Sequence, residues 1–169
     1  MGKSTRMKFL LLIFSCFTGS QLLHAQLVTA PVCPPFEVDV LAGHVSKIYP
    51  KSTLGEVKKK FPCFTSTVED AGAGNCNGVF FQDKGIYFYP ERNYFEIREG
   101  FKGKMTPALM GASRSSLFQT LGYPKLKDPN WDAFQTEYGT LVLYYNKAGK
   151  INKIQISSKS TETLKLCEQ

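Results

Sequence analysis

The sequence predicts an α+β fold built from two units in tandem, in which short helices pack on one face of an antiparallel sheet. Two amphipathic stretches with helical spacing, residues 53–61 and 113–121, are each followed by three segments rich in aromatic and β-branched residues. The stretches can be aligned so that Val57 matches Leu117, which favours an internal duplication. A helix of two turns is not stable alone in water, so we expect each to lie on the sheet that follows it. The two sheets are then expected to join edge to edge or to curve around a common face.

The expected elements follow from local signals along the chain. Thr53 and Glu56 have the spacing of a capping box, and Pro62 marks the end of the first helix. Ser113 is the expected N-cap of the second helix, and Gly122 is expected to end it in a left-handed conformation. Alternation and composition predict strands at residues 36–43, 78–82, 86–90, 94–98, 133–138, 140–146 and 150–157.

The N-terminus has the pattern of a secretory signal peptide, residues 1–25. Basic residues precede an apolar run at 9–17 that is too short to be a stable membrane anchor, and Ala25 supplies a small residue before the expected cut. A lipoprotein cut before Cys16 is the alternative. Membrane attachment is expected only if Cys16 carries a lipid.

The rest of the chain is interpreted as one compact domain. It has an N-terminal extended segment (26–44), a first α+β unit (45–103) and a second unit (104–169). Three of the 21 basic residues and none of the 14 acidic ones lie in the signal peptide, so removing it lowers the net charge from +7 to +4. The remaining lysines are scattered, and the run 58–60 lies on a predicted helix face, so we expect no nucleic-acid partner.

Four cysteines remain after the signal peptide, and an even number in an exported chain predicts disulfides. Three pairings are possible. We favour Cys63 with Cys76, which closes a short loop, and Cys33 with Cys167, which would tie the ends of the domain together. A zinc site is disfavoured because no two cysteines have C-x2-C spacing. The absence of that spacing also disfavours catalytic thiols.

Three stretches together resemble a known group of exported bacterial proteins. They are GIYFYPERNYFEIREGFKGKM (85–105), ALMGASRSSLFQTLGYP (108–124) and YGTLVLYYNKAGKINKIQI (138–156). The pattern resembles the tandem-repeat β-lactamase inhibitor proteins and the small outer-membrane assembly lipoproteins, which share short helices packed on an antiparallel sheet. The spacing of Cys63 and Cys76 is similar to the disulfide placement in the inhibitor repeats. The resemblance concerns the fold, and no inhibitory residue is carried over from it.

The chain lacks the familiar catalytic patterns. His44 is the single histidine after the signal peptide and lies in a predicted loop, where a histidine is usually a solvent-facing polar residue. Ser113, Ser115 and Ser116 have no Gly-x-Ser-x-Gly context and are better explained as residues of a helix start. We therefore expect no enzymatic activity, no catalytic residue, no metal and no cofactor.

Strand alternation instead predicts a binding surface on the sheet. Ile86 and Phe88 are assigned to the core face of their strand. The tyrosines and charged residues at the intervening positions of this and the other strands then share the opposite face. Tyrosine and arginine are typical anchors of protein interfaces. Tyrosines also suit half-buried strands without any function, and this alternative remains open. The predicted surface consists of Tyr87, Tyr89, Tyr94, Glu96, Arg98, Tyr144 and Lys153.

The sequence therefore predicts an exported, non-enzymatic module that binds another protein in the periplasm or outside the cell. An inhibitor or an immunity protein fits this description. The alternative is a structural or assembly lipoprotein of the cell envelope.

Overall fold

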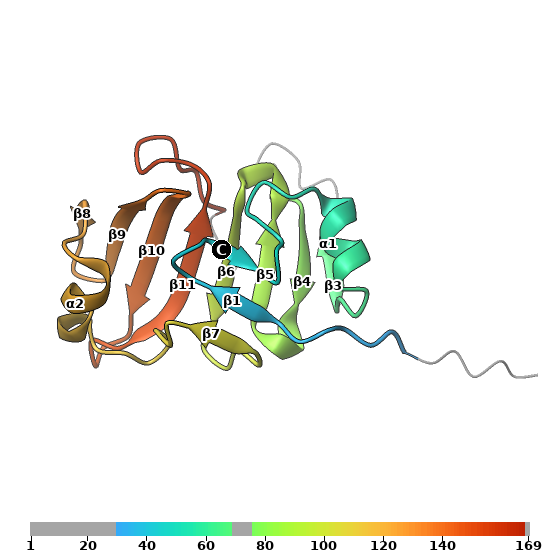
Figure 1. The fold of residues 1–169 in the computed structure, drawn as a ribbon, viewed down its shortest axis with the longest axis horizontal. Coiled ribbons are helices and arrows are strands. Elements are labelled where there is room, and N and C mark those ends of the chain that lie inside the picture. Colours follow the sequence, from blue (N-terminus) through green and yellow to red (C-terminus); the bar gives the residue numbers. More distant parts are fainter. Residues whose placement is uncertain (1–29, 69–75, 168–169) are drawn as a thin grey trace, which may run out of the picture.

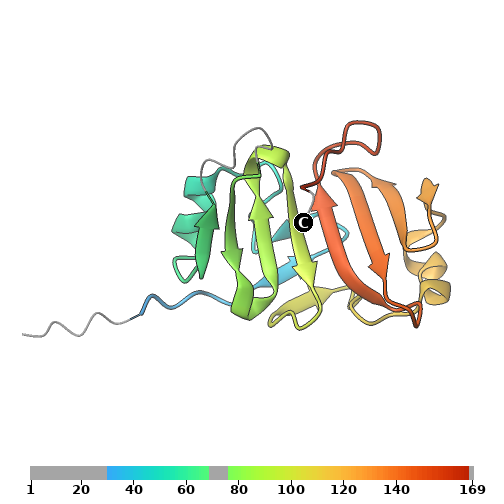
Figure 2. The ribbon, with the colours of Figure 1, turned by 180° about the vertical axis from the view of Figure 1, so that it is seen from behind.

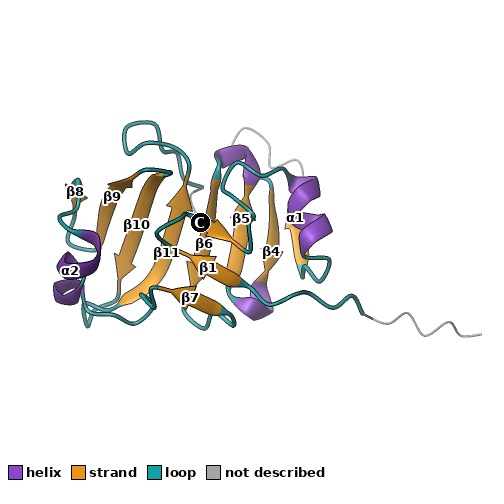
Figure 3. Ribbon diagram, viewed as in Figure 1, coloured by secondary structure: helices purple, strands orange, loops and turns teal. Residues whose placement is uncertain are grey.

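Strands, rather than helices, make up most of this molecule. The computed structural model describes residues 30–68 and 76–167. Strands account for 37% of the described residues and helical segments for 15%, and the two α-helices among these residues are short (Figure 3). The predicted α+β class is therefore wrong, because the structure is mostly β. The predicted signal peptide, including Cys16, lies outside the described residues.

The largest element is an antiparallel sheet of eight strands with the order β3-β4-β5-β6-β11-β10-β9-β8 (Figure 1). Strands β3 to β6 form one half and strands β8 to β11 the other. The halves join edge to edge through β6 and β11, which is one of the two arrangements expected from the sequence. The bounds are β3 (Ser66–Val68), β4 (Gly78–Phe81), β5 (Ile86–Tyr89), β6 (Tyr94–Arg98), β8 (Leu126–Lys127), β9 (Trp131–Thr136), β10 (Gly139–Tyr145) and β11 (Ile151–Ser157).

A smaller sheet lies across the middle of one face of the large one. Its strand order is β2-β1-β7, with bounds β1 (Glu37–Asp39), β2 (His44–Val45) and β7 (Lys104–Thr106). Figure 1 shows β1 and β7 crossing this face near the junction of the halves, while the helices lie toward its two ends. The centre of the core is thus covered by strands, and the expected cover of short helices is wrong.

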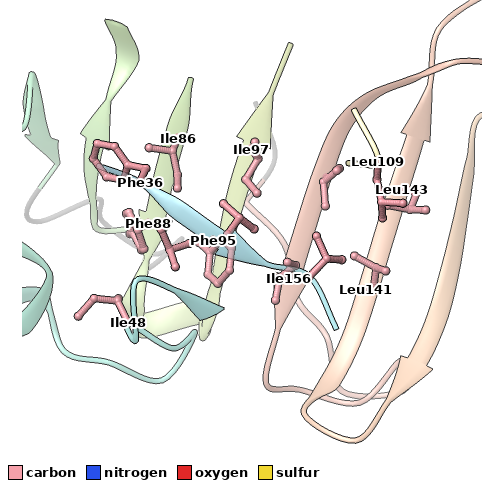
Figure 4. Packing of buried hydrophobic residues seen from close by; sticks show 14 of the residues in the cluster. Phe36, Ile48, Ile86, Phe88, Phe95, Ile97, Leu109, Leu141, Leu143 and Ile156 are labelled. Atoms are coloured by element: carbon pink, nitrogen blue, oxygen red, sulfur yellow. The ribbon is translucent and has the colours of Figure 1, made fainter. Parts of the chain in front are cut away.

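The hydrophobic core lies between these two layers. Phe36 from the N-terminal segment stacks on Phe61 with ring centroids 4.3 Å apart and meets Phe81 edge-on at 5.1 Å. Figure 4 shows the residues of both sheet halves packed beneath β1. The alternation is confirmed for Ile86 and Phe88, which were assigned to this face and are buried. The strands that follow add further buried residues to it: Phe95, Ile97, Leu141, Leu143, Ile154 and Ile156.

The first predicted helix is confirmed as α1 (Leu54–Lys60). The Thr53 side chain accepts a hydrogen bond from the Glu56 backbone N–H at 3.2 Å, and the Glu56 carboxylate accepts one from the Thr53 N–H at 2.7 Å. The hydrogen bonds that the Glu56 carboxylate accepts from the Thr53 backbone N–H and, at 3.1 Å, from the Thr53 hydroxyl lower the pKa of Glu56. Val57 is buried on the inner side of the helix.

The second predicted helix is broken into two short pieces. Residues Arg114–Ser116 form a 3-10 turn, and α2 (Phe118–Leu121) is a single turn. The Ser113 side chain does not cap the backbone, and instead the Ser116 hydroxyl donates to the Ser113 carbonyl at 2.8 Å. The helix ends at Gly122 as expected, and this residue has a positive φ of +73°, but its ψ of −151° lies outside the expected left-handed helical region.

Two disulfides are present, but both differ from the favoured pairing. Cys33 bonds to Cys63, and Cys76 bonds to Cys167. The N-terminal segment runs past the end of α1, which brings Cys33 to Cys63, and the C-terminal segment returns to the start of β4, which brings Cys167 to Cys76. Each chain end is therefore tied to the first half of the molecule rather than to the other end. Two disulfides indicate an oxidising compartment.

The conformation at Gly122 predicts a large difference between two otherwise similar substitutions. A Cβ atom at Gly122 or at Gly55 would meet no other atom within 4 Å, so neither change is limited by space. Gly122→Ala should destabilise by about 1–3 kcal/mol, because residues with a side chain avoid this conformation. Gly55→Ala, within α1, should be neutral or stabilise by up to about 1 kcal/mol. Denaturant unfolding of both variants measures the difference, and equal midpoints would contradict it.

The disulfide pairing predicts which cystine peptides are found without reduction. Peptide mapping should give Cys33 joined to Cys63 and Cys76 joined to Cys167. The sequence separations are 30 and 91 residues, so loop entropy stabilises by about 4 and about 5 kcal/mol respectively. Replacing each pair by alanine should lower the free energy of unfolding by amounts of that order, with the larger loss for the second pair. A peptide joining Cys63 to Cys76 would contradict the structure.

Candidate functional site

Figure 2 shows the outer face of the large sheet, the face opposite β1 and β7. Alternation and strand register place the predicted surface residues on this face. The strand register places Tyr87 opposite Glu96 on β5 and β6, and Arg98 opposite Lys153 on β6 and β11. Lys153 is in turn opposite Tyr144 on β10. Four neighbouring strands therefore bring five of the seven residues into one patch at the junction of the two halves.

Glu96 organises the polar centre of this patch. Its carboxylate accepts hydrogen bonds from the Arg98 Nε and from the Gln155 Nε2, the latter at 2.7 Å. The Gln155 side-chain oxygen accepts a hydrogen bond from the Tyr144 hydroxyl at 2.8 Å. Glu96 is only 2% exposed, so its assignment to the accessible surface is corrected. A carboxylate buried to this degree requires charged and hydrogen-bonded partners, so the network fixes the side chains around it.

Two cations lie over aromatic rings at the surface of the patch. The Arg98 guanidinium carbon is 4.2 Å from the centre of the Tyr87 ring, and the Lys153 Nζ is 4.1 Å from the centre of the Tyr144 ring. About a third of each cationic side chain is exposed to solvent. Cation–π contacts of this kind stabilise the side-chain positions. The patch therefore presents two ordered pairs of a cation and an aromatic ring.

Tyr89 and Tyr94 lie on the same face but are buried, so their assignment to an accessible surface is corrected. They are 2% and 1% exposed, and their rings stack with centroids 4.6 Å apart. The C-terminal segment meets this pair at Tyr94, where the Cys167 backbone N–H donates to the hydroxyl at 3.1 Å. Burial raises the pKa of Tyr94. Alternation identifies the face of a residue, but it does not show whether another segment covers that face.

A groove that was not predicted from the sequence lies beside this patch, and we call it the outer groove. It has a volume of about 470 Å³, and strands β8 to β10 and the C-terminal segment form its walls. Its apolar lining comes from Leu126, Trp131, Ala133, Val142, Leu164 and Leu166. Tyr144 lies at its border and also lines a second hollow that contains Arg98 and Lys153. The two-residue spacing of Leu164 and Leu166 is a local signal from which an inward-facing tail could have been predicted.

The described residues form no cluster of three or more histidine, cysteine or acidic side chains that would suit a metal ion. His44 is not part of the patch, because it lies on β2 in the small sheet that covers the opposite face of the large sheet. Its ring meets the Tyr49 ring edge-on, with centroids 5.2 Å apart. No helix within residues 30–68 and 76–167 is long and apolar enough to cross a membrane.

Comparisons with protein-family models, curated proteins and solved structures found no match to this chain.

Burial and the nearby Glu96 carboxylate predict that the Tyr144 hydroxyl ionises only at high pH. Burial, followed by the negative charge of Glu96, raises the pKa of the Tyr144 hydroxyl to about 12, compared with about 10 for a free phenol. Glu96→Gln should therefore lower this pKa while leaving it above 10, because the burial remains. A titration followed by ¹³C NMR of the tyrosine ring carbons measures it, with Tyr144→Phe to assign the signal. An unchanged pKa would show that Glu96 has no part in the shift.

The sign of the linkage follows from the raised pKa. The neutral hydroxyl is favoured in the folded state, so Tyr144 contributes stability that is complete below about pH 10 and is lost as the pH rises toward about 12. Tyr144→Phe should therefore lose stability less steeply with pH in this window.

Proposed function

We propose that this protein is an exported module that binds another protein through the accessible part of the outer face. The observation that carries the proposal is the convergence of Tyr87, Arg98, Tyr144 and Lys153 from four strands into one ordered patch. Tyrosine and arginine are enriched in the energetically important centres of protein interfaces. The accessible surface is thus smaller than the one expected from the sequence.

The patch is suited to binding because its side chains are already held in place. Arg98 is fixed by the Glu96 carboxylate below it and the Tyr87 ring beside it. Tyr144 is fixed by its hydrogen bond to Gln155 and by Lys153. Ordering a mobile side chain costs about 0.5–1.5 kcal/mol on association, so preorganisation of this kind favours affinity.

The proposed location is the periplasm or the extracellular space. Disulfides persist in oxidising compartments, and two are formed within the described residues. The N-terminal pattern of residues 1–25 supports export by the secretory route. The proposal therefore places both the protein and its partner outside the cytoplasm.

Photo-cross-linking from defined positions tests this function. A photoreactive amino acid at position 87 or 144 should cross-link the same distinct protein in an envelope extract of the producing organism. The control position is 41, because Leu41 is 59% exposed and follows β1 in the opposite layer. Cross-links should be absent from position 41, because that layer faces away from the patch. Identical products from all three positions, or a product from position 41 alone, would contradict the proposal.

A substitution adds a quantitative test of the same patch. Tyr87→Ser should reduce the yield of the cross-link from position 144 at limiting protein concentration, since an interface anchor contributes at least about 2 kcal/mol. Leu41→Ser is the matched control and should leave the yield unchanged. A partner identified as an envelope-assembly component would favour the structural role over an inhibitory one.

A further inference from the structure

We propose that the bond between Cys76 and Cys167 is a releasable latch, and that its reduction by a dithiol protein outside the cytoplasm frees residues 163–167 from the outer face. The inference concerns the chemistry of the chain itself and goes beyond the proposed function, so its test does not need the partner. The two disulfides then have different roles. The bond between Cys33 and Cys63 is a permanent tie, whereas the latch controls how much of the outer face is open.

The segment that the latch holds contributes nothing to the buried core. Among the described residues, the last buried one is Ser157, and every residue of the segment 158–167 is half-buried or exposed. The hydrophobic cluster between the two sheets is complete without this segment, because its last member along the chain is Ile156. The segment can therefore leave its place while the core stays packed.

The first part of the segment is attached to the sheet independently of the latch. The Thr140 hydroxyl donates to the Lys159 carbonyl at 2.7 Å. The Lys125 Nζ forms an exposed ion pair with the Glu162 carboxylate, which joins the segment to the chain beside β8. These contacts end at residue 162, so they define the point beyond which the segment can move.

The last part, residues 163–167, depends on the disulfide. Within the described structure, a single hydrogen bond joins it to the sheet, from the Cys167 backbone N–H to the Tyr94 hydroxyl at 3.1 Å. Leu164 and Leu166 line the outer groove but remain half-buried. Ordering five residues costs more conformational entropy than one hydrogen bond and two partly covered leucines offset. Release is therefore favoured once the bond is broken.

The other disulfide is held closed by the core beside it. Cys33 and Cys63 pack against the hydrophobic cluster, and the Cys63 backbone N–H donates to the Cys33 Sγ at 3.1 Å. Phe36 and Phe61, close to these cysteines in sequence, stack in the core. After reduction, these two thiols stay side by side at a high effective concentration and form the bond again. Cys167 instead moves away with its segment, so the reduced latch persists.

The opening step is a thiol–disulfide exchange. A thiolate of the dithiol protein attacks the Sγ of Cys167 or Cys76, which breaks the S–S bond and leaves a mixed disulfide and one free cysteine. The second thiol of the reductant then displaces the other cysteine. Two electrons and two protons pass to the cystine, which becomes two thiols, and the reductant leaves as a disulfide. Both cysteines are half-buried rather than enclosed, so a reductant can reach them.

Release enlarges the open part of the outer face. The outer groove loses the wall to which Leu164 and Leu166 contribute. Val142, which lines the groove and is 4% exposed while the latch is closed, becomes accessible. The redox state of one bond thus sets how much apolar surface adjoins Tyr144 and the patch.

Equilibration in buffers with an increasing ratio of reduced to oxidised dithiothreitol tests the order of opening in the folded chain. Free thiols are trapped with N-ethylmaleimide and located by peptide mapping. Cys76 and Cys167 should be half-labelled at a ratio at least about tenfold lower than Cys33 and Cys63. Labelling of Cys33 and Cys63 first would overturn the inference. Labelling of all four together would also overturn it, because opening the latch would then unfold the core.

A variant that cannot close the latch tests the release itself. Cys76→Ser combined with Cys167→Ser should give ¹⁵N relaxation typical of a mobile chain at Leu164 and Leu166, while Ile154 in the core keeps its chemical shift. The variant is less stable because its unfolded chain is less restricted, so spectra are recorded below its melting transition. The native chain with only the latch reduced and labelled gives the same measurement without a substitution. An ordered segment in both samples would overturn the inference.

The matched control is Cys33→Ser combined with Cys63→Ser, which removes the other bond and should leave residues 163–167 as ordered as in the native chain. A soluble nitroxide then measures the opening of the groove. It should broaden the methyl signals of Val142 several-fold more when the latch is open, while those of Val38, which is 3% exposed in the core, stay unchanged. Equal broadening of Val142 with the latch open and closed would overturn the inference.

Discussion

The pairing of β6 with β11 is the interaction on which the rest of the structure depends. These strands come from the two halves of the chain, and their register places Ile154 beside Ile97 and Ile156 beside Phe95. All four side chains are fully buried. The pair turns two four-stranded halves into one sheet with a shared core, so the small sheet of β1, β2 and β7 has a continuous surface to cover.

The same pairing builds the outer patch. Glu96 and Gln155 are 59 residues apart in sequence, yet they lie directly opposite each other and share a buried hydrogen bond. If the register of β6 slipped by one residue, the Glu96 side chain would face the hydrophobic core. It would lose its hydrogen bonds to Arg98 and Gln155, and its buried charge would not be compensated. The buried network therefore penalises other registers. The same carboxylate that fixes the register also holds Arg98 at the surface.

The C-terminal segment decides how much of the outer face is accessible. It contacts the stacked pair of Tyr89 and Tyr94 through the hydrogen bond from Cys167 to Tyr94, and Cys167 is bonded to Cys76. It leaves the patch around Tyr87 and Tyr144 uncovered, and it adds Leu164 and Leu166 to the groove. One segment of about ten residues thus creates both the covered and the open parts of this face. The proposed binding function depends on that division.

The sequence by itself determined the features that depend on neighbouring residues. Alternation assigned the correct face to the main strands because side chains on a strand point alternately to its two sides. The capping pair of Thr53 and Glu56 fixed the start of α1, and the glycine at position 122 marked a backbone conformation that other residues avoid.

Only the tertiary structure decided the mostly β class, the disulfide pairing and the groove, because each depends on segments far apart in the chain. The sequence did not predict strands β2, β3, β7 and β8, which have two or three residues each. Runs this short carry too little periodicity to be recognised, and pairing with distant strands stabilises them. Cys33 and Cys167 likewise meet partners chosen by the paths of the two chain ends over the sheet, which no local spacing determines.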